Sequence, residues 1–288
     1  MNRILLIGRT GQVGFELERL LPSLGSFQAV DFPEVDLANP DSIRTTIRAH
    51  SPDLILNAAA YTAVDKAESE PELCHAINAA APAILAEETR RLGSALVHYS
   101  TDFVFNGETD RPYTEEDTPE PLGVYGRTKL EGDKAIQSSG ARHLIFRTAW
   151  VYGRRGKNFL LTIQRLAGGN KPLRIVDDQI GSPTWSRVIA QATVAALKKI
   201  HPEPAGLSWD RVTGLYNLVC GGQTSWHGFA RAFLPAGLPV QPIPTTEYPT
   251  PARRPAYSVL ACDKLRRVFG LSLPHWQDAL RDCLAAND

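Results

Sequence analysis

A tyrosine and a lysine four residues apart, in the segment Tyr125-Gly126-Arg127-Thr128-Lys129, form the first pattern that could carry out chemistry. On a helix, side chains at this spacing share a face. A phenol has a pKa of about 10, and an adjacent ammonium favours the phenolate and lowers that value. We therefore expect Tyr125, with a lowered pKa, to donate a proton to a carbonyl oxygen as hydride reaches the carbon. Lys129 is also expected to hold the ribose hydroxyls of a nicotinamide cofactor.

Such a reaction needs a further hydroxyl beside the carbonyl. The apolar run Ala95–Tyr99 predicts a buried strand, and Ser100 and Thr101 follow it directly. Ligands of open parallel sheets bind beyond the carboxyl ends of the strands. Either Ser100 or Thr101 is therefore a candidate for polarising the substrate oxygen, and an exposed strand end without function is the alternative.

A glycine-rich turn near the start of the chain predicts a site for a dinucleotide pyrophosphate. The pattern G-x-x-G-x-x-G lies between a predicted strand, Arg3–Ile7, and a predicted helix that begins near Gln12. Glycine lets the backbone bend and approach a phosphate, and the helix N-terminus offers free N–H groups. A tight turn without a ligand is the alternative. The expected cofactor-binding residues of this turn are Gly8, Arg9, Thr10, Gly11, Gln12, Val13 and Gly14.

Two residues bear on the choice of cofactor. Asp31 ends the second predicted strand, where an acid commonly binds the adenosine ribose hydroxyls, and this favours NAD. Arg9 lies inside the glycine turn, where its guanidinium can pair with a 2′-phosphate, and this favours NADP. We expect NADP(H) to be the cofactor, with tolerance of NAD(H).

These residues must be positioned by the elements around them, and apolar runs alternate with helical patterns over the first half of the chain. Such an alternation predicts an α/β fold with a doubly wound parallel (Rossmann) sheet covered on both faces. The expected strands are Arg3–Ile7, Gln28–Phe32, Leu54–Asn57, Ala95–Tyr99 and His143–Arg147. The expected helices are Gln12–Leu21, Pro40–His50 with Asn39 as its cap, Pro71–Leu92 with a kink or restart at Pro82, and Tyr125–Ser138.

The second half of the chain predicts a smaller C-terminal substrate-binding lobe. It has Gly- and Pro-rich loops and two helical patterns, Phe159–Ala167 and Ser186–Lys199. The segment Pro235–Pro255 contains seven prolines, which exclude a regular helix or a central strand, and its pair Arg253 and Arg254 favours a binding loop. We expect a Rossmann domain over residues 1–148, to which a helix at about 184–200 returns, and a lobe over residues 149–183 and 201–288.

Composition excludes several classes of function. Lys plus Arg and Asp plus Glu are equal at 31 each, so nothing favours nucleic acid or an anionic membrane as partner. The apolar run Met1–Gly8 is too short for a secretory signal or a membrane span. The four cysteines are dispersed, which predicts reduced structural thiols and a cytoplasmic protein without a cysteine metal site.

Together these segments resemble the extended short-chain dehydrogenase/reductases, and within them most closely the dTDP-4-dehydrorhamnose reductase family. The resemblance runs from residue 3 to about residue 280. The stretches that point to this family, beyond the generic motifs, are Asn57–Glu68, Tyr99–Gly107, Asp178–Thr184 and Thr250–Pro255.

The resemblance implies NADPH-dependent reduction of the C4 keto group of a dTDP-4-keto-6-deoxyhexose, the last step of dTDP-L-rhamnose synthesis for cell-wall polysaccharide. It implies that Thr101, Tyr125 and Lys129 are the catalytic residues. The implied cofactor-binding residues, beyond the glycine turn and Asp31, are Asp36, Leu37, Ala58, Ala59, Ala60, Tyr61, Ser100, Tyr125 and Lys129. The implied sugar-nucleotide pocket comprises Val64, Asp65, Thr101, Asp102, Phe103, Tyr125, Trp150, Arg253, Arg254 and Tyr257. The arginine pair suits a diphosphate, and Trp150 offers a flat face to a sugar ring, although it is equally suited to a core.

The chain departs from the family pattern in three places. Phe103 replaces a frequent tyrosine, and Tyr257 stands where asparagine is common. Some family members form dimers bridged by a divalent cation on glutamates; Glu16 matches one such ligand, whereas Arg187 occupies the place of another. Because a cation would be repelled there, we expect no metal and a monomer or weak homodimer.

Two other functions remain open. A nucleotide-sugar epimerase or dehydratase shares the fold, but dehydratases usually place a second acid where Phe103 stands, which favours plain reduction. A non-catalytic NADP-binding regulatory subunit, such as that of methionine adenosyltransferase, also resembles these reductases, and an intact Thr/Tyr/Lys set does not exclude it. NADPH oxidation with a 4-keto sugar nucleotide distinguishes the two from a reductase.

Overall fold

A six-stranded sheet forms the centre of the computed structural model, which describes residues 3–169, 172–200 and 206–286. The strand order is β10-β5-β4-β3-β1-β2, and all neighbouring strands are parallel. The strands are β1 (Arg3–Ile7), β2 (Ser26–Val30), β3 (Leu54–Asn57), β4 (Ala95–Thr101), β5 (Arg142–Thr148) and β10 (Gly214–Asn217). The doubly wound α/β fold predicted from the sequence is thereby confirmed.

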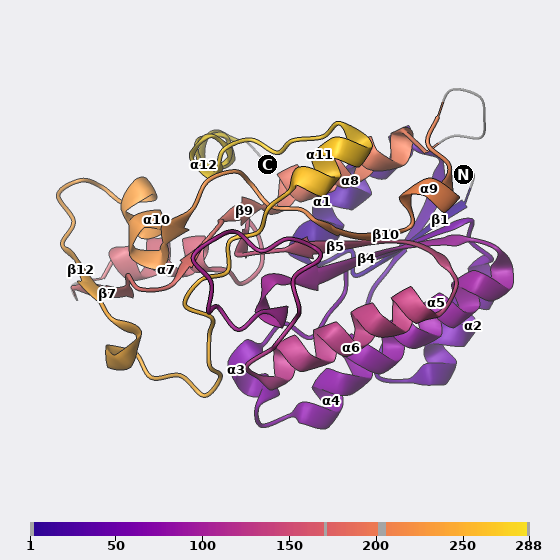
Figure 1. The fold of residues 1–288 in the computed structure, drawn as a ribbon, viewed down its shortest axis with the longest axis horizontal. Coiled ribbons are helices and arrows are strands. Elements are labelled where there is room, and N and C mark those ends of the chain that lie inside the picture. Colours follow the sequence, from indigo (N-terminus) through magenta and orange to yellow (C-terminus); the bar gives the residue numbers. More distant parts are fainter. Residues whose placement is uncertain (1–2, 170–171, 201–205, 287–288) are drawn as a thin grey trace.

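Helices cover both faces of this sheet, as Figure 1 shows. Alternate residues of a strand point to opposite faces, so Ile4 and Leu6 belong to one core and Leu5 and Ile7 to the other. The first face carries α1 (Gln12–Leu20), α8 (Ser186–Lys198) and α11 (Asp263–Phe269). The second carries α2 (Pro40–His50), α4 (Pro71–His75), α5 (Ala81–Leu92) and α6 (Val124–Ser138). Burial on both faces explains why these strands are almost uniformly apolar.

Local signals in the sequence account for several helix ends. The Asn39 side chain caps α2 by accepting hydrogen bonds from the amides of Asp41 and Ser42 at 3.0 and 3.3 Å, as predicted. The predicted helix Pro71–Leu92 is interrupted by a π-helical segment, Ala76–Ala80, between α4 and α5. Pro82 lies in the first turn of α5, where its missing N–H is tolerated, so the helix restarts as expected.

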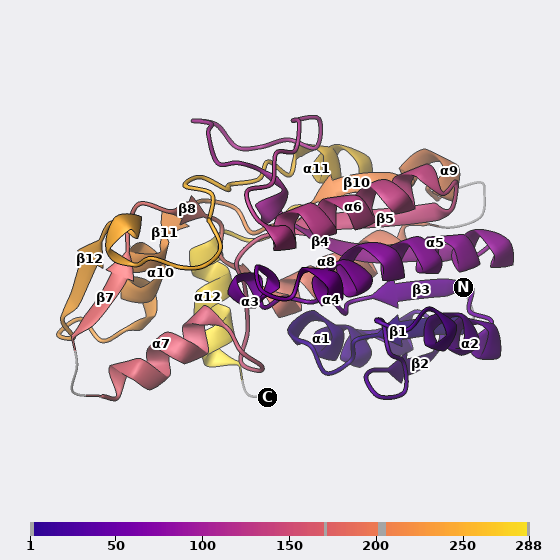
Figure 2. The same ribbon diagram turned by 90° about the horizontal axis from the view of Figure 1, so that it is seen from below.

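A smaller lobe packs beside the carboxyl ends of the strands, on the left of Figure 1 and again in Figure 2. Its helices are α7 (Phe159–Ala167), α10 (Trp226–Phe233) and α12 (Trp276–Ala285), which share a core containing Tyr152, Phe229 and Trp276. Three small sheets complete it: β7 (Leu173–Val176) with β12 (Val240–Ile243), β8 (Ile180–Gly181) with β11 (Thr224–Ser225), and β6 (Val151–Tyr152) with β9 (Thr184–Trp185). The remaining short elements are α3 (Val64–Ala67), α9 (Trp209–Val212), η1 (Leu21–Ser23), η3 (Asp102–Val104) and η4 (Thr245–Glu247).

The structure corrects three expectations about the elements. The second strand is Ser26–Val30, two residues earlier than the predicted Gln28–Phe32. The proline-rich segment, expected to be a loop without regular structure, contains a short strand, β12; the exclusion of a central strand still holds, because β12 pairs only with β7 among the described residues and Pro242 is tolerated there. Strand β10, assigned from the sequence to the lobe, joins the main sheet beside β5. The predicted lobe boundary at residue 201 lies outside the described residues.

Across residues 3–169, 172–200 and 206–286, the structure contains no helix that is both long enough and apolar enough to cross a bilayer.

Candidate active site

The glycine turn is folded tightly against its surroundings. Gly8 has a φ of +90°, and its amide donates to the carbonyl of Val30 at 2.9 Å. A Cβ on Gly14 would lie 1.9 Å from the Gly8 carbonyl oxygen, so only glycine fits there. Gly11 caps α1 without a side-chain hydrogen bond, which leaves the first amides of this helix facing outward for an anion. This is the geometry that a pyrophosphate site requires.

The segment after β3 lies against this turn. A Cβ on Gly8 would be 2.6 Å from the Ala59 amide nitrogen, and the Ala58 amide donates to the Ile7 carbonyl at 2.9 Å. The sheet order reverses between β1 and β3, and ligands of doubly wound folds bind at such a reversal. The structure therefore brings Ala58 and Ala59 against the glycine turn, whereas Tyr61 contacts Asn78 and Glu70 through its backbone and its phenol.

Asp31 stabilises the glycine turn from the end of β2. One of its carboxylate oxygens accepts from the amide and hydroxyl of Thr10 at 2.9 and 2.6 Å, and the other accepts from the Phe32 amide at 2.9 Å. The Arg9 guanidinium pairs with Glu34 at 3.2 Å, and this pair is largely exposed. Both carboxylate oxygens of Asp31 thus accept hydrogen bonds within the protein, whereas the partner of Arg9 within the described part of the chain is the exposed Glu34. Asp36 and Leu37, also expected at the cofactor, follow in the same loop before α2.

Tyr125 and Thr101 meet where the first turn of α6 approaches the end of β4. The Thr101 hydroxyl lies near the Tyr125 phenol, donates to Asp102 at 3.1 Å and accepts from the Phe103 amide at 3.1 Å. The Phe103 ring packs edge-on against the Tyr125 ring at 5.7 Å. The Ser100 hydroxyl donates instead to Asp133 at 2.6 Å. Of the two hydroxyl candidates, Thr101 is the one beside the phenol.

The prediction that the pKa of Tyr125 is lowered is wrong. Burial raises the pKa of the phenol, and the nearby Thr101 hydroxyl offsets that rise only in part. The Lys129 ammonium makes no compensating contact with the phenol, because its Nζ donates to the Tyr99 carbonyl at 2.6 Å and lies 3.0 Å from His98 Nε2. A phenol that keeps its proton is nevertheless the form that a proton donor needs.

Lys129 and Asp102 are both buried. Lys129 is 1% exposed, and burial lowers its pKa to about 8 while Asp133 opposes that shift. Asp102 is 2% exposed, and burial raises its pKa to about 6, while the nearby hydroxyls of Ser258 and Thr101 oppose that shift. Asp102 therefore lies behind Thr101 and not on an open surface of the predicted sugar pocket.

An ion pair of Arg254 attaches the proline-rich loop to the Rossmann domain. Its guanidinium forms a bidentate ion pair with Asp65, with N–O distances of 3.1 and 2.8 Å. The Asp65 carboxylate also accepts a hydrogen bond from the Ala252 amide at 3.2 Å. Arg253 is exposed and has no ion-pair or hydrogen-bond partner among the described residues. The structure distinguishes the two arginines expected near a diphosphate: Arg254 holds the loop to the segment that begins with Val64, and Arg253 is the one whose side chain is exposed.

Trp150 is held in a strained position. Its φ is +46°, and its ring stacks on Trp226 with centroids 3.5 Å apart and planes 2° apart. A Cβ on Gly181 would lie 2.4 Å from the same ring. One face of Trp150, expected to meet the sugar, is therefore covered by Trp226. Tyr257 is partly exposed, and its hydroxyl donates to Gln223 at 3.0 Å.

Sequence reasoning missed three residues of this region. His98 and Asn57 are buried beside Lys129, and Trp226 covers Trp150. His98 and Asn57 had a usable signal, since a polar residue inside an otherwise apolar buried strand needs a polar partner. Trp226 had none, because its contact with Trp150 depends on the folding of the lobe.

Glu16, a potential cation ligand, is already neutralised. Arg187 donates to both of its carboxylate oxygens, at 2.9 and 3.2 Å. Among the residues that the structure describes, no group of three or more His, Cys, Asp or Glu side chains is arranged to hold a metal ion.

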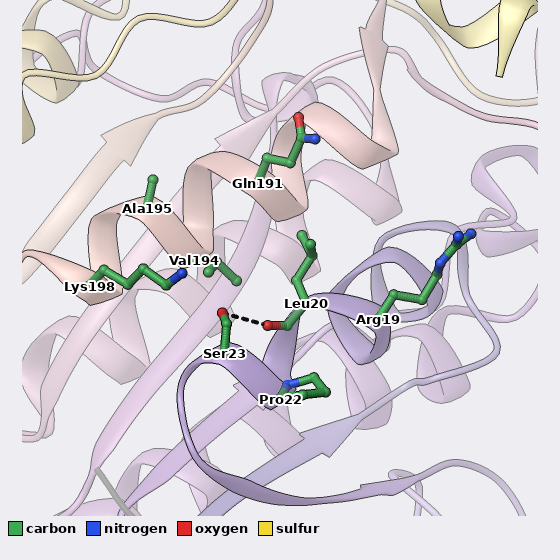
Figure 3. Close-up of a pocket in the computed structure, with 8 residues that line it drawn as sticks. All are labelled: Arg19, Leu20, Pro22, Ser23, Gln191, Val194, Ala195 and Lys198. Carbon is green, nitrogen blue, oxygen red and sulfur yellow. Dashed lines mark hydrogen bonds between the residues drawn. The ribbon is translucent and has the colours of Figure 1, made fainter.

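A hollow of about 420 Å³ lies between α1 and α8, away from this site (Figure 3). Its walls are the sides of two helices and the η1 turn, where Ser23 donates to the Leu20 carbonyl at 2.8 Å. A second hollow, of about 520 Å³, lies between residues 219–223 and 259–263. Neither is lined by Thr101, Tyr125 or Lys129.

Comparison with known proteins gives full-length matches. A family model described as the RmlD substrate binding domain matches residues 1–288. The chain is 44% identical to the dTDP-4-dehydrorhamnose reductase of Escherichia coli, over 98% of this chain and 96% of that protein. It is also 44% identical to the enzyme of the same name from Burkholderia thailandensis, over 98% of both chains. A crystal structure of dTDP-4-dehydrorhamnose reductase from Bacillus anthracis in complex with NADP superposes with a TM-score of 0.90, at 31% identity over 99% of both chains.

Proposed function

The chain belongs to the RmlD substrate-binding family, and from this premise we propose that it is an NADPH-dependent reductase of a nucleotide sugar. The substrate is a dTDP-4-keto-6-deoxyhexose, and the reaction converts dTDP-4-dehydrorhamnose to dTDP-L-rhamnose. The observation that carries this proposal is the 44% identity to reductases of that name over nearly the whole chain. The neutral Tyr125 phenol beside the Thr101 hydroxyl supports it.

NADPH, when bound, supplies the hydride. Tyr125 donates its phenolic proton to the C4 oxygen as that oxygen gains negative charge. The Thr101 hydroxyl hydrogen-bonds to the same oxygen and polarises the carbonyl. Lys129 holds the ribose hydroxyls and, as an ammonium, stabilises the phenolate left on Tyr125. The edge-on Phe103 ring fixes the direction of the phenol.

A direct assay tests the proposal. Purified protein is mixed with NADPH and dTDP-4-dehydrorhamnose, and NADPH absorbance is followed together with the sugar product. A reductase consumes NADPH and forms dTDP-L-rhamnose in equal amounts. An epimerase or dehydratase converts the sugar without net NADPH loss, and a regulatory subunit binds NADPH without turnover; either result would replace the proposal.

Arg9 is proposed to select NADPH over NADH. Removing its guanidinium with Arg9→Ala deletes a charge-assisted hydrogen bond to the 2′-phosphate, which contributes about 1.5–3 kcal/mol. The dissociation constant of NADPH is expected to rise while that of NADH hardly changes, as measured by fluorescence titration.

The matched control for this experiment is Glu34→Gln. It removes the carboxylate that pairs with Arg9, so NADPH binding is expected to tighten. Equal losses of NADPH and NADH affinity in Arg9→Ala would show that Arg9 does not bind the 2′-phosphate.

The substrate diphosphate is proposed to bind at the proline-rich loop. The protein has no net charge, so the second of two anionic ligands needs its own cations. Replacing both Arg253 and Arg254 by alanine is expected to raise the KM of the sugar nucleotide about tenfold or more, with little change in NADPH affinity. Steady-state kinetics with each substrate varied measures both effects.

Single variants separate the two arginines. Arg253→Ala should raise the substrate KM by removing a free cation. Arg254→Ala and Asp65→Asn should give the same defect as each other, because both break the contact that holds the loop. An unchanged substrate KM in the double variant, or an equal loss of NADPH binding, would place the diphosphate elsewhere.

We further propose a cytoplasmic protein that is a monomer or weak homodimer without a bridging cation. None of the four cysteines forms a disulfide, which agrees with a reducing compartment. The Glu16–Arg187 ion pair occupies the carboxylate that a cation would need. Sedimentation with and without Mg²⁺ tests the oligomeric state.

A further inference from the structure

Three buried side chains, each 1% exposed, form a continuous hydrogen-bonded chain beneath α6. Asn57 of β3 and His98 of β4 are direct neighbours in the sheet register. The Asn57 amide lies 3.1 Å from His98 Nδ1, and His98 Nε2 lies 3.0 Å from Lys129 Nζ. The Lys129 amine ends the chain at the Tyr99 carbonyl, 2.6 Å away. Both ring nitrogens of His98 are therefore engaged.

The direction of these hydrogen bonds follows from one backbone amide. The Ala59 N–H is an unambiguous donor, and it lies 3.3 Å from Asn57 Oδ1. The Asn57 NH₂ group must therefore face His98 Nδ1, which accepts. A neutral imidazole with Nδ1 as acceptor carries its proton on Nε2 and donates it toward Lys129. A neutral Lys129 amine satisfies this arrangement, because it accepts from His98 and donates to Tyr99.

A protonated Lys129 conflicts with the same arrangement. An ammonium has no lone pair, so its N–H would face the His98 Nε2–H. Moving the imidazole proton to Nδ1 relieves that contact but sets Nδ1–H against the Asn57 NH₂ group. Rotating the Asn57 amide then sets its NH₂ group against the Ala59 N–H. Each of these arrangements with a protonated Lys129 therefore loses one hydrogen bond within a buried site.

The groups that face Lys129 from the surrounding elements are few. Asp133, one turn further along α6, favours the ammonium, and so does Cys74 of α4. Arg147 of β5 pairs with Asp133 at 3.7 Å and weakens that support. Tyr125, on the preceding turn of α6, keeps its proton. Burial outweighs the two favourable groups, in agreement with the lowered pKa of Lys129, and burial also keeps His98 neutral by lowering its pKa well below the usual value.

We propose that His98, oriented by Asn57, is a positioning residue that controls the protonation of Lys129 and thereby sets the pH above which turnover is lost. The part that concerns turnover rests on the proposed reductase function. The part that concerns the hydrogen bonds does not, because it follows from the Ala59, Asn57, His98 and Lys129 contacts alone.

The pH dependence has a definite sign. Turnover needs the Lys129 ammonium, so kcat is expected to be full below the Lys129 pKa of about 8 and to fall as pH rises through it. In His98→Gln, the side-chain carbonyl oxygen accepts from the ammonium without an opposing donor. The fall in kcat should then move upward by about 1 pH unit. In Asn57→Asp, a carboxylate accepts from Nδ1–H and frees Nε2 to accept from Lys129, so the shift has the same direction.

Thr193→Val is the matched control. The Thr193 hydroxyl bonds to the Tyr99 phenol at 2.9 Å on the opposite face of β4, outside the His98 chain. The pH dependence of kcat in Thr193→Val should coincide with that of the wild type. A fall in kcat at the same pH in wild type, His98→Gln and Asn57→Asp overturns the proposal. If circular dichroism shows that His98→Gln does not fold, Asn57→Asp provides the test instead.

Nitrogen-15 NMR of the histidine rings tests the hydrogen bonds without turnover. The His98 signals are those missing from His98→Gln. We expect the Nε2–H form at high pH and conversion to the Nδ1–H form as Lys129 gains its proton near pH 8. A single Nδ1–H form throughout the range overturns the proposal. The expected conversion in a protein that fails to oxidise NADPH would confirm the His98 chain and refute the proposed function, so the two failures are distinguishable.

Discussion

Replacing Tyr125 by phenylalanine is expected to lower kcat about 10²–10⁴-fold, the usual contribution of general acid catalysis, and to leave NADPH binding nearly unchanged. The ring is retained, so its packing against Phe103 survives and only the transferred proton is lost. Turnover with the 4-keto sugar nucleotide measures the first effect, and fluorescence titration with NADPH measures the second.

Two companion variants sharpen this experiment. Tyr216→Phe removes another buried hydroxyl, one on β10 that donates to the Val212 carbonyl at 2.7 Å, and this variant should turn over normally because β5 separates β10 from β4 in the sheet. Lys129→Met should impair both NADPH affinity and rate, because Lys129 is proposed to serve the ribose and the phenol. A Tyr125→Phe enzyme with near-normal turnover would remove Tyr125 from the catalytic set.

Adding one methyl group at Gly14 is the second change with a large expected effect. The Cβ of Gly14→Ala would lie 1.9 Å from the Gly8 carbonyl oxygen and 3.1 Å from the Arg9 Cα, and backbone atoms cannot move aside cheaply. Overpacking of this kind costs about 1–3 kcal/mol. Because the displaced atoms form the expected phosphate site, NADPH affinity should fall roughly 5- to 150-fold.

A graded series of glycines provides the control. Gly11→Ala places its Cβ 3.3 Å from the Gly8 carbonyl oxygen, so a small shift accommodates it and a smaller loss of NADPH affinity is expected. Gly237→Ala meets no atom within 4 Å and should bind NADPH normally. The dissociation constants and melting temperatures should follow the order of these distances. Normal NADPH binding by Gly14→Ala would exclude the glycine turn as the pyrophosphate site.

Much of the sheet could be predicted from the sequence because the determining interactions are local. The bounds of β1, α2, β3 and α7 coincide with the predicted ones, since apolar runs, a cap at Asn39 and helical spacing specify them within a few residues. The glycine turn was predictable for the same reason: the spacing of Gly8, Gly11 and Gly14 places each glycine where the chain approaches another part of itself.

The electrostatic behaviour of the site was less predictable because it depends on burial. The spacing of Tyr125 and Lys129 correctly places both on α6, but the lysine is bound by Tyr99 and His98 instead of the phenol. Likewise, Arg254 pairs with Asp65, 189 residues earlier in the chain. No local sequence pattern predicts a partner so far away along the chain, so nothing in the sequence distinguished Arg253 from Arg254.

Strand β10 has a consequence for how the protein is synthesised and folded. The main sheet gains its outer strand from residues that follow the first elements of the lobe, and the Asn217 side chain at its end donates to the carbonyls of Tyr113 and Ala261 at 3.0 Å each. On the ribosome, the edge of β5 therefore stays unpaired until the first part of the lobe and α8 have been synthesised and β10 emerges. Exposed edges of this kind promote aggregation. The nascent chain is thus most vulnerable during the interval between β5 and β10, when a chaperone would shield it, and a split of the gene after β5 would produce a fragment that keeps the exposed edge permanently.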